Sequence, residues 1–175
     1  ALQSVRRGQP VWFDAGSVLM LDRARSIASE FGVSNVVLLA TGQEWRRPDV
    51  AAHAGGPFIV PLAFPALPRF TDDADWDDVS LDQLRAWDWA AENPALLRRA
   101  APSAALALTT HGLGDRKEFR RNLALALDRG LPETDALAAL TVVPAALCGV
   151  GNRLGTLEPG RPAHLTVVEG SYFRP

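Results

Sequence analysis

The sequence contains one cysteine and one methionine among 175 residues, and its formal net charge is only −2. A single cysteine excludes an internal disulfide framework, because each disulfide needs two. The near balance of charge supplies no basic surface for nucleic acid, so we expect no nucleic-acid partner. Glycine, proline or charged residues interrupt every apolar run before the roughly 20 residues of a membrane span, so we expect no membrane partner.

The residues that are present suit one folded domain. Hydrophobic residues make up 47% of the chain, which is enough to bury a core at this length. Cys148 lies in an apolar run, where we expect a small buried side chain. The chain begins with Ala1 and not with methionine, so we expect a piece of a longer protein, and the sequence leaves the compartment undetermined.

Strand and helix patterns alternate along the first third of the chain. Short apolar segments at 10–13, 35–40 and 58–60 predict strands, and 35–40 (NVVLLA) is apolar enough to be buried on both faces. Between them, 48–54 predicts a short helix and 17–31 a longer one, in which an apolar face is formed by Met20, Ala24, Ile27, Ala28 and Phe31. This rhythm is typical of parallel strands joined by helical crossovers.

The second part of the chain continues the alternation after an interruption. Prolines and acids across 61–79, including Asp72 to Asp78, predict an extended surface segment. Ser80 to Gln83 has the spacing of a capping box, Asn93-Pro94 is typical of a helix start, and Asp115 to Glu118 predicts a second reciprocal cap. Residues 104–108 predict a fourth strand. Trp45 and Trp76 fall in predicted loops, where they either line a pocket mouth or are isolated exposed aromatics without a function.

Four strands alternating with helices fit two architectures. Half of a (β/α)8 barrel and a doubly wound open sheet are both built from right-handed crossovers, so periodicity leaves both open. No glycine-rich phosphate loop opens any predicted helix, and Gly112-Leu113-Gly114 is too short to serve as one. This weakens a nucleotide-binding interpretation.

The end of the chain predicts a turn followed by a strand. Pro159-Gly160 suits a type II turn, because proline presets φ and glycine supplies the positive φ that follows. Leu165 to Val168 (LTVV) is apolar and partly β-branched, which favours a strand. A lone strand is not stable by itself. We therefore expect this one to pair with a strand of this chain or of a partner.

The tail RLGTLEPGRPAHLTVVEG, residues 153–170, resembles the metal-dependent amidohydrolases, including their imidazolonepropionase-like branch. The segments PVWFDAG, VVLLATGQEW, PFIVPLAFP and ALALTTHGLGD are similar to the fifth to eighth barrel strands of that family. The resemblance implies an α/β fold in which residues 1–150 are the C-terminal half of a (β/α)8 barrel. It also implies that residues 151–175 return into a small β-sandwich and supply one strand to it.

The resemblance also implies chemistry at the carboxyl ends of the strands. Amidohydrolases bind one or two divalent metals there, typically zinc, through a His-x-His pair on the first strand, histidines on the fifth and sixth, and an aspartate on the eighth. The metal lowers the pKa of a bound water, and the aspartate moves its proton. If the chain is the second half, its first-strand pair is absent.

Three positions depart from that pattern. Asp14 stands where the fifth strand would end in histidine, Thr41 follows the sixth strand where another ligand is expected, and His111 replaces the eighth-strand aspartate. Carboxylate oxygen and imidazole nitrogen are both normal zinc ligands. We therefore predict Asp14 and His111 as metal ligands and His111 as a catalytic residue. The resemblance implies a divalent metal, typically zinc, in the full-length protein, and an incomplete site or no metal in this chain.

Each candidate also has a simpler explanation. Asp14 precedes a predicted helix and is suited to cap it, and His111 is suited to bond nearby backbone. His53, near the end of a short predicted helix, and His164, beside the predicted terminal strand, are best explained as structural or surface residues.

Two functions remain open on the sequence. The first is a fragment of a metal-dependent hydrolase of C–N bonds other than peptide bonds, acting on a small cyclic amide or amidine; the isolated chain is expected to be inactive. The second is a catalytically inactive amidohydrolase-like module for binding or assembly. Half a barrel leaves sheet edges open. We therefore expect as partner the N-terminal half of the barrel or further copies of this chain, with two halves pairing to mimic a closed barrel.

Overall fold

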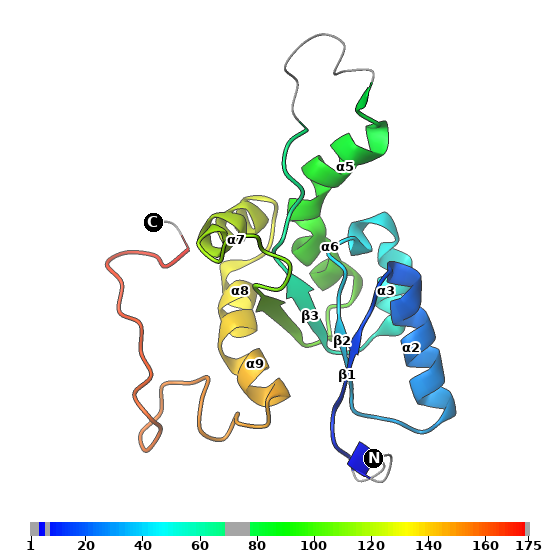
Figure 1. The fold of residues 1–175 in the computed structure, drawn as a ribbon. Coiled ribbons are helices and arrows are strands. Elements are labelled where there is room, and N and C mark those ends of the chain that lie inside the picture. Colours follow the sequence, from blue (N-terminus) through cyan, green and yellow to red (C-terminus); the bar gives the residue numbers. More distant parts are fainter. Residues whose placement is uncertain (1–3, 6–7, 69–77, 174–175) are drawn as a thin grey trace.

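A single parallel sheet organises the fold (Figure 1). The computed structural model describes residues 4–5, 8–68 and 78–173. Within them, strands β1 (Val11–Asp14), β2 (Val36–Leu39), β3 (Phe58–Pro61) and β4 (Leu106–Thr109) lie side by side in chain order. A doubly wound sheet reverses its strand order at a switch point, and these four strands do not. The α/β fold is consistent with part of a (β/α)8 barrel, which confirms the expected fold class.

The core lies between the sheet and the helices that cover it. Leu38, Phe58 and Leu106 project from neighbouring strands and are 2% exposed or less, and the registers pair Leu38 with Phe58 and Phe58 with Leu106. Burying an apolar side chain of this size stabilises the fold by roughly 1.5–3 kcal/mol. The apolar runs that predicted strands therefore form the centre of the molecule.

Helices α2 (Val18–Glu30) and α3 (Pro48–Ala54) follow β1 and β2, with the 3-10 turn η1 (Glu44–Arg46) between β2 and α3. Both predicted helices are confirmed, and α3 ends at Gly55, whose φ of 56° is left-handed. The predicted face of α2 is wrong in part. Ala24 and Ala28 are buried, but Met20, Ile27 and Phe31 are 36%, 57% and 73% exposed, because no described element covers that side of the helix.

After β3 the chain runs outward and returns through α5 (Leu81–Trp89), the 3-10 turn η2 (Ala90–Glu92) and α6 (Asn93–Ala100). The predicted capping box of α5 is confirmed, with Ser80 and Gln83 bonded reciprocally. Helix α5 buries none of its side chains and projects from the body of the molecule (Figure 1). Part of the predicted surface segment, 69–77 with Asp72 to Asp77 and Trp76, lies outside the described residues.

Three helices follow β4: α7 (Glu118–Asp128), α8 (Glu133–Leu140) and α9 (Val142–Leu147). The predicted reciprocal cap at Asp115 is wrong, because the helix begins later, at Glu118. The Asp115 side chain instead accepts a hydrogen bond from the Lys117 backbone N–H at 2.9 Å. Cys148 was expected to be buried, but it follows α9 and is exposed.

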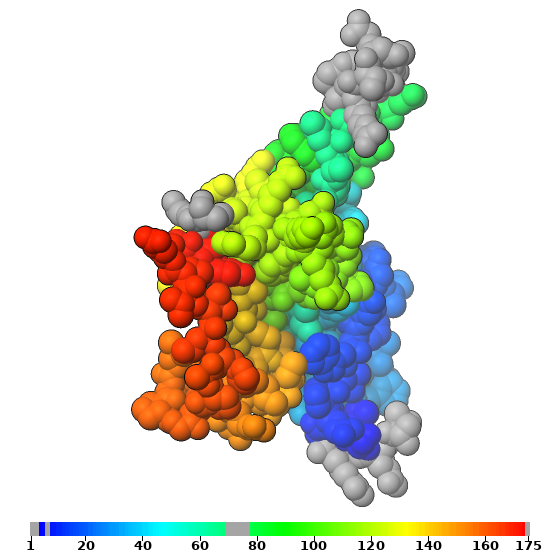
Figure 2. Space-filling model, turned by 60° about the vertical axis from the view of Figure 1, so that its left-hand side comes forward, coloured from blue at the N-terminus to red at the C-terminus, as the bar shows by residue number. Residues whose placement is uncertain are grey.

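The tail beyond α9 runs over the surface on the side of α7 to α9 (Figures 1 and 2). The predicted strand at Leu165 to Val168 is wrong for this structure: these residues form no strand, and Val167 is 90% exposed. The physical reason is that no described strand lies beside them to complete their hydrogen bonds. Near the end, Tyr172 and Phe173 pack against the core. The division into residues 1–150 and 151–175 stays a prediction.

Gly155, in the tail motif RLGT, approaches the start of α9 closely. Its φ is +99°, and a Cβ at this position would lie 3.0 Å from the Val142 Cα and 3.1 Å from the Thr141 carbonyl oxygen. Both the positive φ and the close approach require glycine here. Among the described residues, no helix has the length and apolar character that crossing a membrane would need.

Candidate functional site

A hollow of about 260 Å³ opens on the face of the sheet that the helices leave uncovered. All four strands or the residues just after them contribute to its lining, which is mostly apolar. The lining residues are Trp12, Phe13, Asp14, Leu39, Ile59, Thr109 and His111. Because the strands are parallel, their carboxyl ends meet at one edge of the sheet, and the polar members of the lining come from that edge.

Asp14 is the last residue of β1, and its side chain is exposed beside the hollow. Just beyond Asp14, the Ala15 N–H donates a hydrogen bond to the Leu39 carbonyl oxygen at 3.3 Å, which ties the end of β1 to β2. The simpler explanation, that Asp14 caps α2, finds no support. The N-cap position of α2 is Ser17, and that cap has no side-chain hydrogen bond.

His111 lies two residues beyond β4 and lines the same hollow. Its backbone N–H donates to the Thr109 hydroxyl at 3.2 Å, so the turn that carries it is bonded locally. The next residue, Gly112, has a φ of +79°, and a Cβ there would come within 3.2 Å of the Ala63 side chain. The backbone therefore fixes where His111 leaves β4, while its side chain remains exposed.

The structure places Asp14 and His111 around one hollow without joining them. They form no ion pair with each other within the described part of the chain. β1 and β4 are the two outer strands, so three steps of about 4.8 Å separate them, roughly 14 Å across a flat sheet. Asp14 and His111 can lie closer together than this only if the sheet is curved.

A metal ion needs more donors than these two residues offer. A catalytic zinc site takes three protein ligands and a structural one takes four. Among residues 4–5, 8–68 and 78–173, no group of three or more His, Cys, Asp or Glu side chains is placed to hold a metal ion. The described residues therefore do not complete a metal site, and the assignment of Asp14 and His111 as ligands stays a prediction.

The carboxyl end of β2 contains a buried acid that the sequence did not single out. Glu44 is 1% exposed, and four donors surround its carboxylate. Oε1 accepts from the Thr41 N–H at 2.6 Å and from the Thr41 hydroxyl at 2.7 Å. Oε2 accepts from the Gly42 N–H at 3.1 Å and from the Asn93 Nδ2 at 2.8 Å. These bonds occupy the oxygens of Glu44, which is therefore a structural acid that fixes the loop after β2.

Asn93 extends this network to α6. It was expected to open a helix as a cap, but it lies inside the first turn, is 1% exposed, and accepts a hydrogen bond from the Trp45 N–H at 2.7 Å. Trp45 was expected at a pocket mouth and is instead buried, edge-on to Trp89 with ring centroids 5.5 Å apart. The spacing Thr41-x-x-Glu44 matches that of a capping box, and this signal could have found Glu44.

The other two histidines lie away from the hollow. His53 is on α3 with its side chain 81% exposed, and its Nε2 is 3.8 Å from the Asp22 Oδ1. His164 is exposed in the tail. Neither lines the hollow, which agrees with their expected surface or structural roles.

The carboxylates with displaced pKa values lie outside the hollow. A hydrogen bond from the Arg47 guanidinium lowers the pKa of Asp49 to about 2. A hydrogen bond from Arg46 likewise lowers the pKa of Asp82 on α5. The Arg46 Nη2 lies 2.9 Å from the Asp82 Oδ2, so this pair joins the loop after β2 to the projecting helix α5.

Comparisons with known proteins agree with this architecture. A sequence profile described as the amidohydrolase family matches residues 78–175, more than half of the chain. The solved structure of an amidohydrolase from Thermotoga maritima MSB8 is similar, with a TM-score of 0.69 and 28% sequence identity over 98% of this chain. The match spans only 41% of the Thermotoga chain. No curated protein matches significantly. The chain belongs to the amidohydrolase family.

Proposed function

We propose that this chain is part of a metal-dependent hydrolase that cleaves C–N bonds other than peptide bonds, in the imidazolonepropionase-like branch of the family. Membership of the amidohydrolase family supports the hydrolase class. Because the chain spans 41% of the length of its Thermotoga relative, the activity belongs to a longer protein. A small cyclic amide or amidine is the substrate class that we propose.

The observation that carries the proposal is the common placement of Asp14 and His111. They follow the carboxyl ends of the two outer strands, β1 and β4, yet both line one hollow. The walls contributed by Trp12, Leu39 and Ile59 are apolar and suit the face of a ring. Polar groups stand beside them, where a reacting amide would be oriented and where the His111 imidazole can hold or move a proton.

Members of the family usually bind a divalent metal, which supplies a hydroxide nucleophile near neutral pH. We propose zinc as the metal and Asp14 and His111 as two of its ligands. The described residues do not complete its coordination, so we expect the isolated chain to be inactive. The remaining ligands would come from the other part of the barrel.

Zinc titration of this chain tests the two ligands. We expect weak binding by calorimetry in the wild type and its loss in both Asp14→Ala and His111→Ala, since either change removes half of the donor set. His53→Ala is the matched control, because His53 is an exposed histidine away from the hollow. In a longer protein that contains this chain, both site variants should also abolish hydrolysis of cyclic amides. Unchanged zinc binding and turnover would remove both residues from the proposal.

A second candidate is an inactive module for binding or assembly. The specific observation in its favour is the end of β2, where Thr41 and Glu44 bond to each other and Glu44 has no open oxygen for a metal. A longer protein that contains this chain, stays free of metal under zinc titration and still binds a cyclic amide would support this candidate over the hydrolase.

A further inference from the structure

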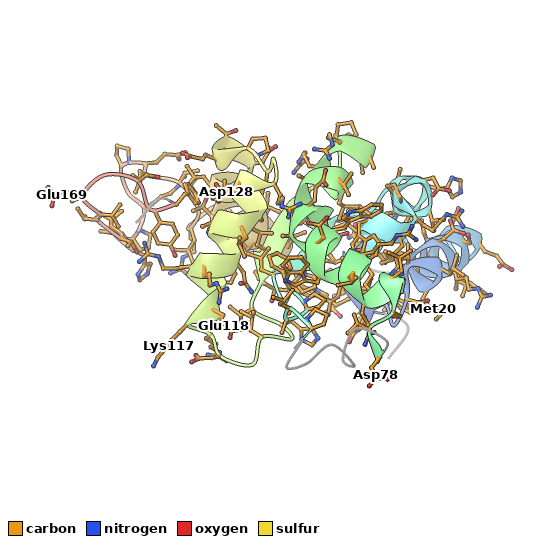
Figure 3. The ribbon with its side chains drawn as sticks, turned by 90° about the horizontal axis from the view of Figure 1, so that it is seen from above. Met20, Asp78, Lys117, Glu118, Asp128 and Glu169 are labelled. Carbon is orange, nitrogen blue, oxygen red and sulfur yellow. The ribbon has the colours of Figure 1, made fainter. Side chains whose placement is uncertain are left out.

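A buried asparagine on α7 reaches back to the loop after β3. Asn122 is 9% exposed, and its Nδ2 donates to the Leu62 carbonyl oxygen at 2.7 Å, across 60 residues of sequence. Figure 3 shows α7 from above, with Glu118 and Asp128 labelled at its two ends. Helix α7 follows β4 in the chain, so this bond ties the element after β4 to the end of β3.

Leu62 also bonds to the end of β4. It is 0% exposed, and its N–H donates to the Thr109 carbonyl oxygen at 3.2 Å. This bond continues the pairing of β3 with β4 just beyond Pro61. The backbone of Leu62 is therefore held on both sides, by β4 through the N–H and by α7 through the carbonyl oxygen.

Ala63 connects this held backbone to the turn that carries His111. The Leu62 carbonyl belongs to the peptide bond shared with Ala63, so the bond from Asn122 restrains where the Ala63 methyl group lies. Gly112 follows His111 directly, and a Cβ at Gly112 would come within 3.2 Å of the Ala63 side chain. Ala63 therefore packs against the turn, and a shift of Ala63 removes this support from His111.

We propose that Asn122 is a positioning residue for His111, acting through the Leu62 carbonyl and the Ala63 methyl group. This role rests on the proposed function, in which the His111 imidazole holds or moves a proton at the hollow. Asn122 does not line the hollow, so its effect on the chemistry is indirect. An imidazole that transfers a proton must lie within hydrogen-bond reach of the reacting group. Holding the backbone at His111 maintains that placement.

Asn93 provides a matched control. It is also a buried asparagine on a helix that bonds to a loop after a strand, but its partners Glu44 and Trp45 do not line the hollow. Loss of either asparagine leaves buried groups without a partner and lowers stability. Stability alone therefore does not separate a positioning residue from a structural one, and the test must measure the turn of His111 itself.

NMR relaxation of the His111 and Gly112 backbone amides in this chain measures how firmly the turn is held. Asn122→Leu keeps the approximate size of the side chain and removes the donor. We expect it to lower the order parameters of both amides, and Asn93→Leu to leave them at wild-type values. Circular dichroism verifies that each variant is folded. Wild-type order parameters and amide chemical shifts in folded Asn122→Leu would overturn the proposal.

Ala63→Gly tests the same connection from its other end. It keeps the Asn122 bond, and it should fold because Ala63 is only half-buried. We expect it to lower the order parameters at His111 and Gly112. The double variant with Asn122→Leu should lose less than the sum of the two single losses, because both changes act through one path. No loss in Ala63→Gly, or losses that add in full, would overturn the proposal.

Turnover in a longer protein that contains this chain separates this proposal from the proposed function. We expect Asn122→Leu to lower kcat several-fold with KM unchanged, and His111→Ala to abolish turnover. Full turnover in His111→Ala would remove the proposed function, while the order parameters would still decide whether Asn122 holds the turn. Wild-type kcat in Asn122→Leu together with an inactive His111→Ala would overturn the positioning role alone.

Discussion

The β1 side of the molecule, made of β1 and α2, contrasts with the β4 side, made of β4 and α7 to α9. Both sides are built from the same strand and helix units. On the β4 side the strand is buried and the helices contact it, whereas on the β1 side Trp12, Ile27 and Phe31 are more than half exposed. The contrast shows that the same pattern of strand and helix can have its apolar side chains buried or exposed, depending on which elements pack against it.

The same contrast divides the candidate site. Asp14 comes from the open β1 side, and His111 follows the covered strand β4. The turn of His111 is held by the Thr109 hydroxyl and by the close packing of Gly112. No described strand lies on the outer side of β1 or of β4. A complete site therefore depends on what lies beyond both outer strands.

The largest expected effect comes from truncating a core side chain on the β4 side and comparing it with an exposed side chain on the β1 side. Leu106→Ala on β4 should lower the free energy of unfolding by roughly 2–5 kcal/mol, because it leaves a cavity under well-packed helices. Ile27→Ala on α2 should change it by no more than about 0.5 kcal/mol, because the Ile27 side chain is 57% exposed. Urea unfolding followed by circular dichroism gives both values. Equal losses in the two variants would mean that the β1 side is as well packed as the β4 side.

An intermediate effect is expected at Glu44, in the loop after β2. Glu44→Ala leaves the Thr41 and Gly42 N–H groups and the Asn93 amide without their acceptor, and should cost roughly 2–3 kcal/mol in the same urea experiment. Glu44→Gln should lose less, because its amide keeps one acceptor oxygen in place. If Glu44→Ala unfolds at the wild-type urea concentration, the network does not fix this loop.

The smallest expected effect concerns α5, which resembles the β1 side in being exposed. A hydrogen bond from Arg46 lowers the folded-state pKa of Asp82 below its ordinary value of 3.8. The pair therefore stabilises the fold fully at pH values above that ordinary pKa, and this contribution is lost as the pH falls through the lowered pKa. Asp82→Asn should therefore melt slightly below wild type at neutral pH, and the two melting curves should converge in acid. A difference that persists at low pH would assign the effect to something other than the ion pair.

Local features were predictable where neighbouring residues alone decide them. The four strands, α3 with its glycine stop and the capping box at Ser80 follow from short-range patterns. The face of α2 was predicted only in part, because two apolar stripes lie on that helix and the sequence does not say which one meets the sheet. The tail strand failed for a similar reason, since LTVV favours a strand but needs a neighbour to pair with.

For the candidate site, the sequence selected Asp14 and His111 by their positions after strands, and the structure places both around one hollow. It did not select Glu44 or Asn93, which are 49 residues apart and meet only in the folded chain. Whether Asp14 and His111 bind metal stays a prediction.

The sequence by itself determined the alternation of strands and helices, their approximate ends and the family resemblance, since these rest on periodicity, turn residues and motifs. Only the tertiary structure decided the strand order, the exposed side chains of β1 and α2, the buried carboxylate of Glu44 and the exposure of the tail. These features depend on contacts between residues far apart in the chain, and a buried acid or an exposed stripe is defined only by what packs against it.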